Sequence, residues 1–205
     1  MRGRTVKRIL EISGLAAGVA MVAIGIVAIV LGTTGHSTVI DSIKQERITG
    51  SADMTPVLIR EAGKKAGLPE STEYPTCDVA GKAVDGGDRA RCFAEYMRIH
   101  ALEATGGKVY SEMGRYLTAD GKDTSDPDAA AKNPDTGRPV ENGLRNLWVT
   151  ETALATALNT SYLAQRISVF SIVVGIALLL SGIGFMILAW YRLGAALRRR
   201  KPGAA

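Results

Sequence analysis

Charged residues are absent from two long segments of this 205-residue sequence, residues 12–35 and residues 167–191. Each segment is longer than the about 20 apolar residues that an α-helix needs to cross a bilayer. We therefore expect two transmembrane helices and exclude a simple soluble protein. The segment between them, residues 36–166, is too short for a catalytic barrel of about 250 residues.

Ionisable residues are missing from the central part of both predicted spans. Pumps, proton relays and many transporters need such groups inside the membrane. Their absence argues against transport by this chain alone. The first apolar segment is also longer than the about 7–15 apolar residues of a cleaved signal peptide, so we expect an uncleaved signal anchor.

Histidine is scarce, with only His36 and His100 in the chain. A Ser-His-Asp triad could be built on His100, but no nucleophile motif such as G-x-S-x-G is present. An iron site of two histidines and one carboxylate would need both histidines. Four aspartates between residues 120 and 128 lack the spacing of an EF-hand, which favours a solvated loop. We expect no catalytic residue, no metal ligand and no bound cofactor.

The two cysteines, Cys77 and Cys92, both lie in the middle segment, and the chain has no C-x-x-C motif. Extracytoplasmic compartments are oxidising, so a structural disulfide is the expected state of this pair. Closing a loop of about 15 residues stabilises a fold by roughly 3 kcal/mol in the chain-entropy model. We predict a Cys77–Cys92 bridge in a small domain that needs such support.

The net charge of +5 is unevenly distributed along the chain. The ends, residues 1–11 and 192–205, hold nine Lys and Arg against one acid, whereas the middle segment holds sixteen against nineteen. Positive flanks remain cytoplasmic, which predicts both termini in the cytoplasm and residues 36–166 outside it. Basic clusters also bind nucleic acid. Here they lie where topogenic charge is expected, so we predict contact with bilayer headgroups and not with nucleic acid.

Small residues recur every seven positions in both predicted spans, and seven residues are about two helical turns. Each set therefore follows one helix face, and small faces let helix backbones approach closely. We predict that the spans pack against each other as an antiparallel pair; the alternative is that one face serves a partner or a second copy. The predicted packing residues are Gly18, Gly25, Gly32, Ser168, Gly175, Gly182 and Ala189.

Helical signals dominate the middle segment. Thr55-Pro56 predicts a helix start before residues 57–66, because a hydroxyl caps the helix and proline fits its first position. Further helices are predicted over residues 89–105, with Tyr96 and His100 on the apolar face, and over residues 109–117. Residues 118–140 are polar and predict a surface loop or hairpin. From Glu141 a helix with an apolar stripe that includes Leu144, Leu147 and Trp148 should continue into the second span.

These expectations define the predicted fold class. We expect an all-α membrane protein of two antiparallel transmembrane helices, residues 12–35 and 167–191, with a small helical extracytoplasmic domain between them.

The stretch I-H-A-L-E-A-T-G-G-K-V-Y-S-E-M at residues 99–113 is similar to a known family, as are E-R-I-T-G at 46–50 and D-M-T-P at 53–56. The likeness resumes at residues 152–154 and at residues 158–163. The chain resembles an actinobacterial family of two-span membrane proteins that are often labelled "aromatic ring-opening dioxygenase LigA". The resemblance implies an actinobacterial plasma membrane and the same hairpin topology.

The function that fits these features best is that of a non-catalytic interaction or accessory protein of the cell envelope. One alternative is an extracytoplasmic ligand sensor that acts through a signalling partner. A second alternative is a membrane-anchored enzyme of the ring-opening dioxygenase type. We expect the bilayer and a membrane-protein partner or a second copy as partners. The candidate interaction surface comprises His100, Glu103, Gly106, Gly107, Lys108 and Tyr110.

Overall fold

The computed structural model describes residues 2–198, which form two compact units. The paired-helix unit contains residues 2–38 and 164–198, and the middle unit contains residues 39–163. Two long helices, α1 (Arg2–Gln45) and α4 (Gly143–Arg198), contribute to both units. Arg199, Arg200 and Lys201 of the predicted basic tail lie outside the described residues.

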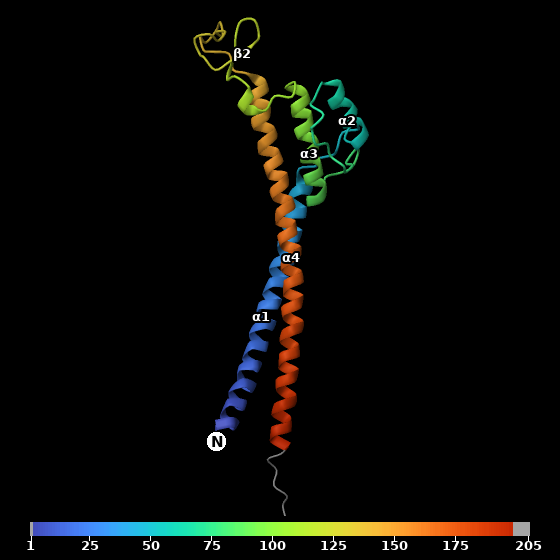
Figure 1. Ribbon diagram of the computed structural model, residues 1–205, viewed down its shortest axis with the longest axis vertical. Helices are drawn as coiled ribbons and strands as arrows, with labels where there is room; N and C mark the ends of the chain where they lie inside the picture. The colour runs from blue at the N-terminus through green and yellow to red at the C-terminus, as the bar shows by residue number, and fades with distance from the viewer. Residues whose placement is uncertain (1, 199–205) are drawn as a thin grey trace, which may run out of the picture. The chain divides into compact units, whose positions relative to one another are not determined.

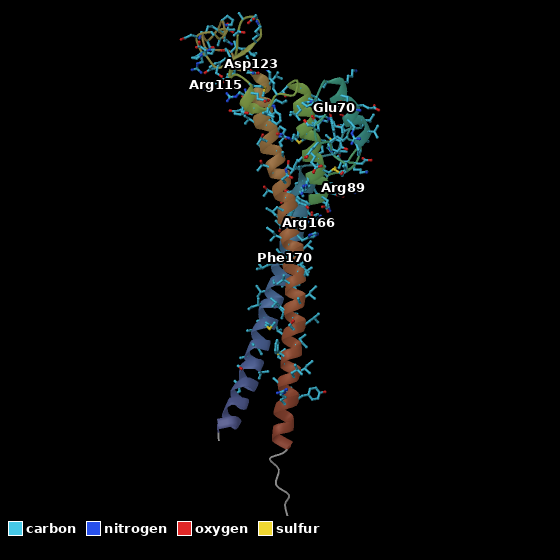
Figure 2. All side chains as sticks on the ribbon, viewed as in Figure 1. Glu70, Arg89, Arg115, Asp123, Arg166 and Phe170 are labelled. Atoms are coloured by element: carbon cyan, nitrogen blue, oxygen red, sulfur yellow. A yellow bond between two sulfur atoms is a disulfide. The ribbon has the colours of Figure 1, made fainter. Side chains whose placement is uncertain are left out.

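Helices α1 and α4 are each long and apolar enough to cross a membrane, over Ile12–Gln45 and Gly143–Arg192. Only 11% of the most apolar window of either helix is buried. The core helix of a soluble protein would be mostly covered, whereas these helices turn large apolar side chains outward. Phe170, labelled in Figure 2, is 67% exposed, and Leu31 is also 67% exposed.

Small residues form the contact between α1 and α4 in the paired-helix unit, where the two helices lie side by side (Figure 1). The glycine seam pairs Gly18 with Gly182, Gly25 with Gly175, and Gly32 with Ser168, and all six residues are buried. The numbers rise along one helix as they fall along the other, so the pair is antiparallel, as the sequence predicts. A Cβ on each of the three α1 glycines would lie 2.9, 2.7 and 2.8 Å from the carbonyl oxygen of its partner. Ala189, the last predicted member of the set, is half-buried.

The first helix that lies wholly in the middle unit is the predicted short helix α2 (Pro56–Lys65). The Thr55 side chain accepts a hydrogen bond from the amide of Leu58 at 3.3 Å, and Pro56 takes the first helical position. Gly67 follows the helix with a φ of +75°, a left-handed conformation that glycine adopts without strain. The start and the end of this helix are therefore those that the sequence predicts.

Helix α3 (Gly87–Ala104) is the centre of the middle unit. One side buries Tyr96 and Ile99 against α2 and the loop that follows it, and another side buries Ala90 and Ala94. The predicted apolar face is correct for Tyr96, which is fully buried, but His100 lies at its edge. Because α3 is covered on more than one side, its buried surface is wider than one periodic stripe.

The prediction of a helix over residues 109–117 is wrong. The structure has a single 3-10 turn, η1 (Tyr110–Glu112), and then the strand β1 (Tyr116–Leu117), which pairs antiparallel with β2 (Asp123–Thr124). Gly114 packs directly against the backbone of Thr124, and its amide donates to Asp123 Oδ2 at 2.7 Å. This contact draws the chain into a hairpin, which lies partly in the segment predicted to be a loop or hairpin.

Helix α4 begins at Gly143, two residues after the predicted position. Asn142 caps it: its Oδ1 accepts from the amide of Leu144 at 3.1 Å, and its Nδ2 donates to the carbonyl of Gly114 at 3.0 Å. Trp148 is buried as predicted, but Leu144 and Leu147 are exposed, at 46% and 40%. Leu158, which the sequence also places on this stripe, is buried, and so is Glu151, which it does not.

Candidate interaction site

The predicted disulfide joins Cys77 and Cys92 in the structure, with their Cα atoms 6.1 Å apart. It ties the loop after α2 to the first half of α3. Beside it, the buried Tyr96 hydroxyl donates a hydrogen bond to the carbonyl of Cys77 at 2.6 Å. Burial raises the pKa of Tyr96 to about 12, because the phenolate would lose its hydration. The disulfide and Tyr96 hold the loop and α3 as one body.

His100 lies beside the carboxylate of Asp53 near the end of α3. Its Nε2 is 3.0 Å from Asp53 Oδ2, an ion-pair distance once the imidazole is protonated. A hydrogen bond from the Ser51 hydroxyl is the main cause that lowers the pKa of Asp53, and His100 lowers it further. The sequence gives no local sign of this pair, because Asp53 precedes α2 and His100 lies on α3.

Glu103 completes this acidic cluster one turn after His100. Burial raises the pKa of Glu103, and its Oε1 is a buried oxygen without a hydrogen-bond partner in the structure. A buried acceptor without a partner normally costs stability. The cluster of Asp53, His100 and Glu103 therefore contains one buried acceptor that no described residue satisfies.

The turn after α3 explains why two glycines stand at Gly106 and Gly107. Their φ angles are +62° and +82°, so both positions favour glycine. The carbonyl of Lys108 is then held by the Thr105 hydroxyl at 2.6 Å and by Trp148 Nε1 at 2.9 Å. These bonds attach the turn to α4, which gives the double glycine a structural role.

The six residues of the predicted surface divide into separate local groups. His100 and Glu103 lie with Asp53, whereas Lys108 forms an ion pair with Asp123 at 3.3 Å. Tyr110 is 44% exposed, and the guanidinium of Arg145 lies over its ring, 4.1 Å from the centroid. Asp53, Asp123 and Arg145 were not among the predicted site residues, since each comes from a different element of the fold.

Among residues 2–198, no three His, Cys, Asp or Glu side chains lie close enough together to hold a metal ion. His36 belongs to the paired-helix unit and His100 to the middle unit. Neither unit therefore contains both of the histidines that such an iron site would require.

Comparison of the chain with protein-family models, curated proteins and solved structures finds no match in any of the three. The class of protein is therefore defined by the fold: a mostly helical chain whose two long apolar helices pack against each other and could span a membrane. The resemblance to the actinobacterial two-span family stays a prediction.

Proposed function

We propose that this chain is an integral membrane protein of the cell envelope that acts as a non-catalytic interaction or accessory protein. In this proposal α1 and α4 cross the plasma membrane, both termini are cytoplasmic, and the middle unit is extracytoplasmic. The proposal also includes membership of the actinobacterial two-span family that the sequence resembles.

The glycine seam supports the membrane placement. Gly25 and Gly175 bring the helix backbones into direct contact, so each helix covers the inner face of the other. The outer faces carry exposed apolar side chains, whose contact with water is unfavourable and whose contact with lipid chains is not. This arrangement explains why two helices with so little buried surface can form a stable pair.

The proposed orientation rests on charge and on the disulfide. The positive ends of the chain favour the cytoplasm, and the middle segment has more acids than bases. The Cys77–Cys92 bridge belongs to an oxidising compartment. Both features favour the same side for the middle unit.

One observation carries the interaction role, and it concerns α4 before it reaches the predicted span. Leu147 and Leu154 are 40% and 48% exposed, and they stand two turns apart on one face of the helix. They lie along one edge of the buried stripe that includes Trp148 and Leu158. Contiguous exposed apolar surface marks sites of protein contact. We therefore propose that a membrane-protein partner or a second copy covers this leucine face.

Site-specific photo-crosslinking in living cells tests the proposal. A photoreactive residue at Leu154 should give one defined crosslinked species, identified by mass spectrometry after mild-detergent purification. The same residue at Val149, which is 54% exposed on another face of α4, is the matched control and should give none. Leu147→Ser should abolish the crosslink from position 154. Equal crosslinking from both positions, or none from either, would contradict an interaction through this face.

A further inference from the structure

A polar pocket lies between η1, the residue just before β1, and the start of α4 in the middle unit. It is lined by Tyr110, Arg115, Glu141, Arg145 and Asn146. These residues come from two stretches of sequence that Asn142 joins, through its hydrogen bond to Gly114. Arg115 lies at the hairpin end of this unit, near Asp123 in Figure 2. None of its lining residues belongs to the His100 cluster or to the leucine face.

Both arginines of the pocket lack a carboxylate within ion-pair distance among residues 2–198. Each guanidinium is placed instead over a tyrosine ring: Arg145 over Tyr110 at 4.1 Å, and Arg115 over Tyr116 at 5.4 Å. Stacking on a ring fixes the plane of the guanidinium and leaves its N–H groups free to bind at its edge. The arginines are therefore held in place without being neutralised.

One hydrogen-bond donor of Arg145 has no partner. Its Nε is buried and has no hydrogen-bond partner in the structure. A buried charged donor without a partner lowers the stability of the fold, so such donors are rare in proteins. The guanidinium has four further N–H groups, and Arg145 lines the pocket, so these are the donors that an acceptor in the pocket could meet.

We propose that the pocket binds a small carboxylate, either a free organic acid or the C-terminal carboxylate of a peptide. Two guanidiniums and the carboxylate of Glu141 leave a net charge of about one positive unit, which matches a single carboxylate better than a dianionic phosphate. A planar carboxylate also fits the fork of a guanidinium with two parallel hydrogen bonds. Asn146 Nδ2 donates to Glu141 Oε2 at 3.5 Å and has a second N–H for the ligand, and Glu141 can also accept from a neighbouring N–H of the ligand. This inference goes beyond the proposed function and does not depend on a protein partner.

Ligand-detected saturation-transfer NMR on the full-length protein in nanodiscs tests the proposal. The probes are acetate, trialanine, trialanine with an amidated C-terminus, and inorganic phosphate. Trialanine should bind and its amide should not, because amidation removes the carboxylate. Acetate binding would identify a free organic acid as sufficient, whereas trialanine binding alone would identify a peptide terminus. Equal binding of trialanine and its amide, a preference for phosphate, or no binding at all would overturn the proposal.

Substitutions of the pocket arginines test whether the ligand binds at this site. Arg145→Gln should weaken trialanine binding by about tenfold or more, since a charge-assisted bidentate contact is lost. Arg115→Gln should also weaken it and serves if the first variant does not fold. Arg60→Gln is the matched control, because Arg60 lies over the Tyr74 ring at 5.9 Å outside the pocket. Wild-type affinity in both pocket variants, or the same loss in the control, would refute the site.

Discussion

Replacing Gly25 by alanine places a methyl group where the backbones of α1 and α4 touch. The new Cβ would lie 2.7 Å from the carbonyl oxygen of Gly175 and 2.9 Å from the amide nitrogen of Leu179. Ordinary contact begins at 3.4 Å, so the helices must separate locally by about 0.7 Å. A gap of that size forfeits about a quarter to a half of the dispersion energy across it. We expect Gly25→Ala to destabilise the pair by about 1–3 kcal/mol, the range for overpacking.

Gly184→Ala is the matched control for this prediction, because no atom outside its own helix backbone lies within 4 Å of the Cβ it would gain. Both substitutions raise helix propensity, by about 1 kcal/mol in a soluble helix, so their difference isolates the contact. The assay is SDS-induced separation of the helices in mixed micelles, followed by energy transfer between fluorophores at the two termini. Gly25→Ala should shift the midpoint to lower SDS, and Gly184→Ala should not. Indistinguishable midpoints would refute the account of the glycine seam.

Three further predictions concern the middle unit. Replacing both Cys77 and Cys92 by serine should lower its stability by about 3 kcal/mol, measured by thermal unfolding, and an unchanged melting temperature would contradict a structural disulfide. Glu103→Gln should raise the melting temperature at pH 7 but not at pH 3.5. The raised pKa of Glu103 means that ionisation opposes folding, so stability is lost as the pH rises through that pKa; an equal gain at both pH values would contradict this cause. Asn142→Ala should cost about 1–3 kcal/mol in denaturant unfolding, because a helix cap and the bond to Gly114 are both lost. Asn133→Ala, in an exposed turn, is its control and should cost less than half as much.

The features that the sequence predicts are those carried by local or periodic signals. The spans follow from uninterrupted apolar runs, the start of α2 from Thr55-Pro56, and the pairing of the two helices from the repeat at Gly18, Gly25 and Gly32. The cysteine pairing follows because the chain has only Cys77 and Cys92 to join. Each of these signals lies within a short stretch or has a single solution.

The features that the sequence does not predict depend on contacts between distant residues. The β1–β2 hairpin forms where Gly114 meets Thr124, although residues 109–117 have an apolar spacing typical of a helix. Glu151 is buried on α4 while Leu147 is exposed, because other elements decide which side of a helix is covered. The polar pocket likewise arises only when η1 meets α4. The pattern of a single sequence does not show which distant residues come into contact.

Membrane topology is the measurement that tests the central claim most directly. Single cysteines are introduced at the exposed Ser125 of the middle unit or at Thr5 near the N-terminus, while Cys77 and Cys92 remain bonded. Intact cells are then treated with a membrane-impermeant maleimide. The account predicts that the Ser125→Cys protein is labelled in intact cells and the Thr5→Cys protein only after permeabilisation. Labelling of Thr5→Cys in intact cells, or protection of Ser125→Cys, would contradict the account.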